Sequence, residues 1–144
     1  MAMNDEECAT REFEAAVRLN PGFLKYRNIL SRIYFRQDRM KGTIEMQDAL
    51  QYGRKYFSFG RIDLEEAVRA YFNLVNAFIS AGDRERARTV LDELSEALSH
   101  ISADRFSGRP AIGEGIAGKP GIEAEIGRLR AEIQNLPGPP PDLK

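Results

Sequence analysis

The stretch YFNLVNAFISAGDRERARTVL, residues 71–91, decides the fold of this chain. Its first half places apolar residues three and four positions apart, which is the spacing of one buried helix face. Gly82 then interrupts the pattern, as glycine does at the left-handed end of a helix. After Asp83 the same spacing resumes at Ala87 and Leu91. The stretch therefore predicts two helices joined by a tight turn.

Helical spacing extends outward from this stretch over most of the chain. We expect helices over about residues 4–19, 23–37, 40–56, 64–81 and 84–101, and no segment alternates with the period of two that marks a half-buried strand. Asn4 with Glu7, and Asp63 with Glu66, have the spacing of capping boxes. The residues predicted to face inward include Phe13, Val17, Leu30, Tyr34, Met40, Ile44, Leu50, Val68, Leu94 and Leu98. The sequence thus predicts an all-α protein.

The composition changes after residue 101. Glycine, serine and proline dominate the next twenty residues and predict a linker. A final amphipathic helix would dock on another helix pair, in this chain or in a partner, through Ile122, Ile126, Leu129, Ile133 and Leu136. The predicted organisation is a helical domain over 1–101, a linker over 102–121, a docking helix over 122–136 and an extended tail over 137–144.

Length and composition bound the class of protein. The chain has 144 residues and a net charge of −1, which fits one globular domain and gives no global attraction to nucleic acid or membranes. Cys8 is the only cysteine, and we expect it to be a buried hydrophobe in a reducing compartment. The first residues carry acids where a secretory signal carries bases, so we expect a cytoplasmic protein.

The charge is unevenly distributed along the chain. Residues 21–61 hold nine Lys and Arg against three acids, a net of +6, while the segments on both sides are acidic. Neighbouring helices could pair these charges with one another. Alternatively, the basic segment forms a face that attracts an acidic partner.

The stretch around residues 71–91 resembles a tetratricopeptide repeat, whose period is about 34 residues. Three partial units share one frame, although the interval from Tyr34 to Phe78 exceeds a period by about ten residues. The matching positions are Tyr71, Leu74, Val75, Phe78, Ala87 and Leu91, then Ala9, Phe13, Ala16 and Pro21, and finally Leu30 and Tyr34. Thr43 and Ser31 stand where small residues are expected. The resemblance implies a short right-handed stack of antiparallel helix hairpins, about two and a half repeats long.

The resemblance also implies which residues line a binding groove. In such repeats the first helix of each pair faces a concave surface that holds a partner protein. The corresponding positions here are Lys25, Asn28, Arg32, Arg36, Arg69, Asn73, Asn76 and Ser80. Side-chain amides and guanidinium groups suit peptide backbone and carboxylates. A solvated polar face is the simpler alternative.

Other motifs give little support for catalysis. Residues 113–119 satisfy a phosphate-loop pattern, but Pro120 replaces the hydroxyl residue that would hold magnesium, and no buried strand precedes. His100 is the only histidine, and its place at a predicted helix end suits a cap. We therefore expect no enzyme, no metal and no cofactor.

The sequence favours a non-catalytic adaptor or scaffold subunit that binds a protein segment or packs into a larger complex. The alternative is a nucleic-acid-binding helical repeat that uses the basic segment 21–61. Within it, residues 52–61 interleave aromatics with bases, a composition that can stack on single-stranded nucleic acid. Anchoring of the same aromatics on the core is the simpler interpretation.

Overall fold

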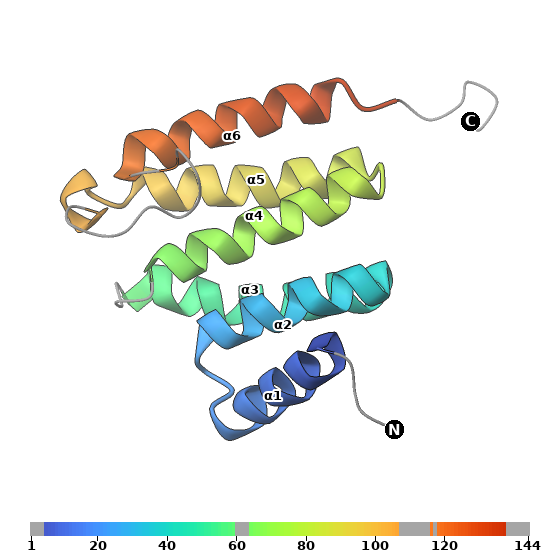
Figure 1. The fold of residues 1–144 in the computed structure, drawn as a ribbon. Coiled ribbons are helices and arrows are strands. Elements are labelled where there is room, and N and C mark those ends of the chain that lie inside the picture. Colours follow the sequence, from blue (N-terminus) through green and yellow to red (C-terminus); the bar gives the residue numbers. More distant parts are fainter. Residues whose placement is uncertain (1–4, 60–63, 107–115, 117, 138–144) are drawn as a thin grey trace. The chain divides into compact units, whose positions relative to one another are not determined.

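The structure is a computed structural model that describes residues 5–59, 64–106, 116 and 118–137. These residues form helices and no strand, so the predicted all-α class is confirmed (Figure 1). The helices are α1 (Asp5–Leu19), α2 (Leu24–Gln37), α3 (Arg39–Phe59), α4 (Leu64–Ser80), α5 (Arg84–Ser99), the 3₁₀ turn η1 (Ala103–Phe106) and α6 (Gly118–Gln134). Asn4 and Asp63, the predicted caps, lie outside the described residues.

The chain divides into two compact units, Met1–Leu74 and Val75–Lys144. The division falls inside α4, which contributes its first part to one unit and its last part to the other. The predicted right-handed stack of hairpins is an arrangement across both units, and it stays a prediction.

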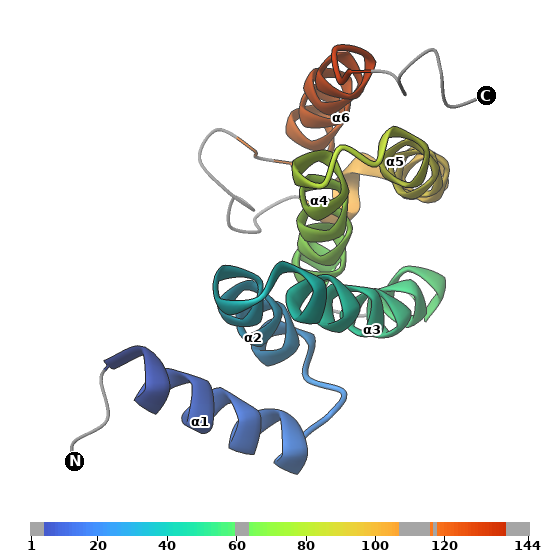
Figure 2. The ribbon, with the colours of Figure 1, turned by 90° about the vertical axis from the view of Figure 1, so that its right-hand side faces the viewer.

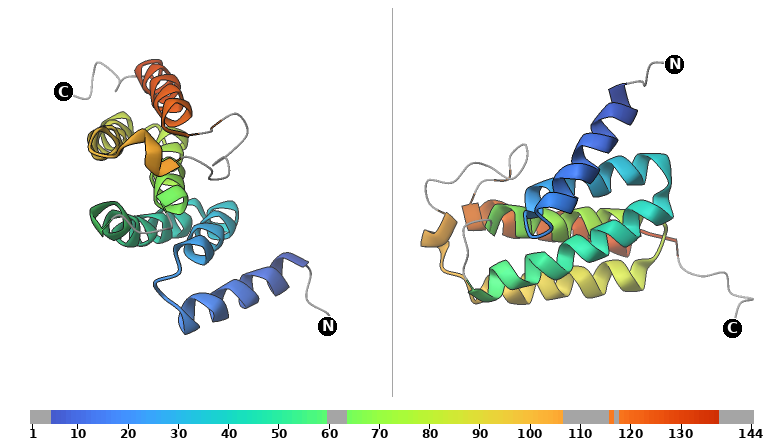
Figure 3. Two further views of the ribbon diagram at one scale, coloured as in Figure 1. Left: turned by 90° about the vertical axis from the view of Figure 1, so that its left-hand side faces the viewer. Right: turned by 90° about the horizontal axis from the view of Figure 1, so that it is seen from below.

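In the first unit, α2 and α3 form an antiparallel hairpin joined by the single residue Asp38 (Figures 1 and 3). The Asp38 carboxylate accepts a hydrogen bond from the Met40 amide at 3.0 Å, which caps the start of α3. Against α2 lies α1, none of whose residues is buried (Figure 2). Cys8 is half-buried rather than enclosed in a core as expected.

The backbones of α2 and α3 lie close together at Gly42. A Cβ placed on Gly42 would lie 2.3 Å from the Cα of Phe35, so only glycine fits there. At 100° per residue, this contact turns the face with Met46 and Leu50 inward and the opposite face outward. Leu50 is buried as predicted, but the predictions for Met40 and Ile44 are wrong, because these side chains are 74% and 52% exposed.

Most of α4 is buried, as its continuous apolar sequence predicts. Gly82 has φ +72°, and the amides of Gly82 and Asp83 donate to the carbonyls of Ile79 and Phe78. This is a Schellman cap. The Asp83 carboxylate then accepts from the Arg86 amide at 3.1 Å and starts α5. The turn predicted from the sequence is therefore confirmed.

In the second unit, α6 packs against α5 of the same chain. Four of the five predicted docking residues are buried, and Leu136 is half-buried. The buried side chains on the two helices are Leu91, Leu94 and Leu98, and Ile122, Ile126, Leu129 and Ile133.

The predicted linker is shorter than expected, since it contains η1 and the first turn of α6. Phe106 of η1 is buried, and η1 packs on α6. Pro120 is tolerated in the first turn of α6 because amides there have no partner within the helix. Lys119 donates to the carbonyl of Ile101 at 2.8 Å and ties this turn to the end of α5.

Candidate interaction surface

Helix α2 is strongly cationic, with four bases and no acid among its residues. Lys25, Arg32 and Arg36 are exposed and follow one another at intervals of seven and four residues, so they lie along one side of the helix. We call these three residues the cationic stripe. At the rise of an α-helix, the stripe is about 16 Å long.

Little opposite charge within the unit neutralises the cationic stripe. Arg36 pairs with Glu6 of α1 at 3.7 Å, but the two side chains are 60% and 48% exposed, and such surface pairs contribute little free energy. Among the described residues, neither Lys25 nor Arg32 has an ion-pair partner. Two cations are therefore available to an external acid.

Asn28, a predicted groove residue, is not on the surface. Its side chain is 1% exposed, and its Nδ2 donates to the backbone carbonyl of Glu66 at 2.9 Å and to Glu66 Oε1 at 3.1 Å. Glu66 Oε2 in turn accepts from Arg69 at 3.0 Å. Asn28 therefore ties α2 to α4 inside the first unit instead of facing a partner.

Two amide atoms near this tie are buried without a hydrogen-bond partner in the part of the chain that the structure describes. They are Asn28 Oδ1, an acceptor, and Asn73 Nδ2, a donor. Asn73 follows Glu66 by seven residues on the same side of α4, a rise of about 10 Å. We call Asn28, Glu66, Arg69 and Asn73 the polar cluster.

Six of the eight predicted groove residues belong to the first unit. Asn76 and Ser80, which are exposed, belong to the second unit. Sequence reasoning missed the role of Glu66, because its spacing from Asp63 suggested a helix cap. The signal that could have found it is its position three residues before Arg69 on the polar side of α4.

The buried side chain of Tyr34 connects α2 to α1. The Tyr34 hydroxyl donates to the Glu14 carboxylate. Burial, and then this bond, raise the pKa of Tyr34 above its ordinary value, so the phenol stays protonated. The ammonium of Lys41 lies 4.0 Å from the centre of the same ring. These contacts hold α1 close to one end of the cationic stripe.

Catalytic and metal-binding groups do not converge in the described part of the chain. No group of three His, Cys, Asp or Glu residues there could hold a metal ion. His100 caps the end of α5 through its backbone amide, and the Lys119 ammonium is engaged by Ile101. The glycines of the phosphate-loop pattern lie outside the described residues, except Gly118. None of the described helices has the length and apolar character that a membrane span requires.

Comparison with known proteins gives no family for this chain. No protein-family model matches it, and neither a curated protein nor a solved structure does so.

Proposed function

We propose that this protein is a non-catalytic interaction subunit that binds an acidic segment of a partner protein. The binding surface is the cationic stripe of α2, with the polar side of α4 beside the bond between Asn28 and Glu66. The fold that presents it is a short, irregular relative of the tetratricopeptide stack.

The observation that carries this proposal is an acid-free helix with unpaired cations. Helix α2 holds four bases, and Lys25 and Arg32 have no ion-pair partner among the described residues. Guanidinium groups form strong, directional hydrogen bonds with carboxylates. Several such charges in a row give selectivity for acidic segments and faster association, although each exposed pair adds little affinity.

Close helix crossings support the paired-helix proposal. Gly42 lets the α2 and α3 backbones meet, and Ala87, the small residue expected at the corresponding crossing of a later pair, is 0% exposed. The contact falls at Gly42 and not at Thr43, one residue from the register that the resemblance implies. Thr43 instead donates its hydroxyl to the Arg39 carbonyl at 2.7 Å.

The polar cluster suits recognition of peptide backbone. Asn73 is half-buried, and a backbone carbonyl of a bound segment would satisfy its Nδ2 donor. Arg69, which pairs with Glu66 at 3.0 Å, lies four residues before Asn73 on the same side of α4.

Nucleic acid is the second candidate, since the cationic stripe would also attract phosphates. One observation weighs against base stacking by the aromatic residues of the segment 52–61. The guanidinium of Arg27 lies 4.2 Å from the centre of the Tyr52 ring and covers one face of that ring.

A charge-matched pair of double variants tests the proposal. The probes are a fluorescent glutamate-rich peptide and a uridine oligonucleotide of equal charge. Lys25→Gln with Arg32→Gln should weaken peptide binding about tenfold, since it removes two charge-assisted contacts. Arg11→Gln with Arg18→Gln lowers the charge of exposed α1 equally and should leave binding unchanged.

Fluorescence anisotropy measures both affinities, and circular dichroism verifies that each variant remains helical. Equal losses in the two double variants would show that only net charge matters, which contradicts the proposal. Tighter binding of the oligonucleotide than of the peptide, with a steep salt dependence, would favour the nucleic-acid candidate instead.

A further inference from the structure

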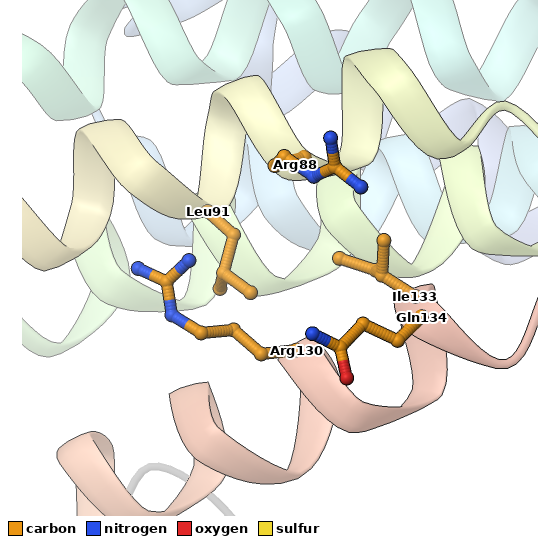
Figure 4. A pocket seen from close by; sticks show the side chains of 5 residues that line it. All are labelled: Arg88, Leu91, Arg130, Ile133 and Gln134. Carbon is orange, nitrogen blue, oxygen red and sulfur yellow. The ribbon is translucent and has the colours of Figure 1, made fainter.

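A small hollow of about 60 Å³ lies on the seam between α5 and α6 (Figure 4). Leu91 and Ile133 form its apolar floor and are 0% and 2% exposed. Three polar side chains, Arg88, Arg130 and Gln134, surround the floor. We call these five residues the seam site.

The seam site lies beside a completed ion pair. Helices α5 and α6 run antiparallel, since Arg84 at the start of α5 binds the carbonyl of Gln134 at the end of α6. Arg130 of α6 pairs with Asp92 of α5 at 2.5 Å. Arg88 lies one turn before Asp92 in α5, and Gln134 lies one turn after Arg130 in α6. The two side chains lie on the two sides of the hollow.

The Arg88 and Gln134 pair thus resembles the Arg130 and Asp92 pair, except that it has a base and no acid. Gln134 is neutral, and Arg88 has no ion-pair partner in the described ranges. Because Asp92 neutralises Arg130, the hollow retains about one positive charge, that of Arg88. The Gln134 amide can add a hydrogen-bond donor and the floor can bury methylene groups.

We propose that the seam site binds the side-chain carboxylate of a glutamate in a partner protein. The carboxylate pairs with Arg88 and accepts from the Gln134 amide, while the two methylenes lie on Leu91 and Ile133. The hollow is small and lies at the surface of the α5–α6 pair, so a single side chain can enter it from solvent. The site uses neither the cationic stripe nor the polar cluster, so it does not depend on the proposed function.

The charges around the hollow favour a carboxylate over a phosphate group. A phosphate carries nearly two negative charges and needs several donors. Here Asp92 already neutralises Arg130, so Arg88 alone would have to balance both charges of a phosphate. The apolar floor also gives a phosphate oxygen no hydrogen bond, whereas it suits the methylenes of glutamate.

The test uses the full chain and two capped heptapeptides, Gly-Ala-Leu-Glu-Leu-Ala-Gly and its twin with Gln in place of Glu, with inorganic phosphate as a third probe. Binding is followed by NMR through the Nε–H signal of Arg88. The glutamate peptide should shift this signal, and the glutamine peptide and phosphate should bind at least about tenfold more weakly.

Two variants locate the effect. Arg88→Gln should reduce affinity for the glutamate peptide about tenfold, measured by isothermal titration calorimetry. Gln134→Glu should do the same, because the new carboxylate occupies the site from within the chain. Arg11→Gln, which lowers the net charge equally from α1, should have no effect.

The Gln134→Glu variant should remain folded, because its new carboxylate can pair with Arg88. A loss of binding in this variant therefore does not result from unfolding. If that variant binds the glutamate peptide as tightly as the original chain, the proposal is wrong. Equal binding of the glutamate and glutamine peptides, or tighter binding of phosphate, would overturn it as well.

Discussion

The α2–α3 pair and the α5–α6 pair are held together in different ways. The first pair is joined by one residue and meets backbone to backbone at Gly42. The second pair is joined by residues 100–117 and meets through large side chains such as Leu94 and Leu129. A short connection already limits where two helices can lie, whereas a long one leaves the position to the side chains.

The second pair has hydrogen bonds from cations to backbone carbonyls at both ends, whereas in the first pair Arg27 and Lys41 lie over the aromatic rings of the facing helix. Arg84 donates to the carbonyls of Gln134 and Leu136 at the end of α6, and Lys119 binds Ile101 at the other end. Leucine and isoleucine stripes favour close packing but tolerate sliding by a turn. The comparison therefore teaches that one glycine can set the register of a tightly joined pair, while a loosely joined pair needs ties at its ends.

The largest effect should come from Gly42→Ala. The added methyl group would meet the backbone of Phe35, which cannot move away as a flexible side chain could. We expect the free energy of unfolding to fall by about 3 kcal/mol, at the upper end for overpacked sites. Urea denaturation followed by circular dichroism measures the change.

Gly127→Ala is the matched control in α6. Gly127 lies in the middle of α6, and a Cβ there would meet nothing within 4 Å. Because alanine favours helix, this variant should gain about 0.5–1 kcal/mol. If both variants lose stability alike, the contrast between backbone contact and side-chain contact is incorrect.

An intermediate effect is expected from Arg84→Met, which keeps the length of the side chain and removes its donors. The last carbonyls of α6 then lose their charged partner, and we expect a loss of about 2 kcal/mol. Arg88→Met, one turn away and exposed, should change stability by less than about 0.5 kcal/mol. Thermal unfolding of both variants measures the two losses of stability. Equal losses would show that the hydrogen bonds from Arg84 to the end of α6 do not stabilise the pair.

The smallest effect, and one confined to a pH range, should come from Glu45→Gln in α3. Burial, and then the charge of Asp48, raise the pKa of Glu45 above 4.5 in the folded protein, against the opposite influence of Arg27 and Lys41. Between the pKa of Glu45 in the unfolded state and its higher pKa in the folded state, the folded state binds more protons. The free energy of unfolding therefore falls as the pH rises through this range.

Glu45→Gln removes that dependence. The variant should be more stable than the original chain at about pH 7 and indistinguishable from it below about pH 4, where the carboxyl is neutral in both states. Urea midpoints at the two pH values provide the measurement. A variant that is less stable at pH 7 would show that the carboxylate is favourably paired after all.

The sequence predicted the positions of helices and turns better than it predicted which side of each helix is buried. Gly82 and Asp83 fixed the turn between α4 and α5, because glycine at positive φ and a capping carboxylate act locally. The isoleucine and leucine stripe of α6 was likewise sufficient to predict a docked helix. Local chemistry and helical period determine such features, so they can be read from the chain alone.

The faces of α3 and the role of Asn28 could not be read in that way. Which side of α3 turns inward depends on the contact between Gly42 and Phe35, a tertiary feature that outweighs the apolar character of Met40 and Ile44. Asn28 was expected in the binding groove because the resemblance places it on the first helix of a pair. It is buried because the carbonyl and carboxylate of Glu66, far away in sequence, satisfy its amide.

The shallow attachment of α1 has a consequence for the dynamics of the first unit. A helix with no buried residue contributes little to the core, so it can detach while α2 and α3 stay folded. Its amide hydrogens should then exchange with solvent through local opening at a lower free energy than those of α2. Each opening also releases Arg36 from Glu6, so the cationic stripe briefly gains a third cation without an ion pair.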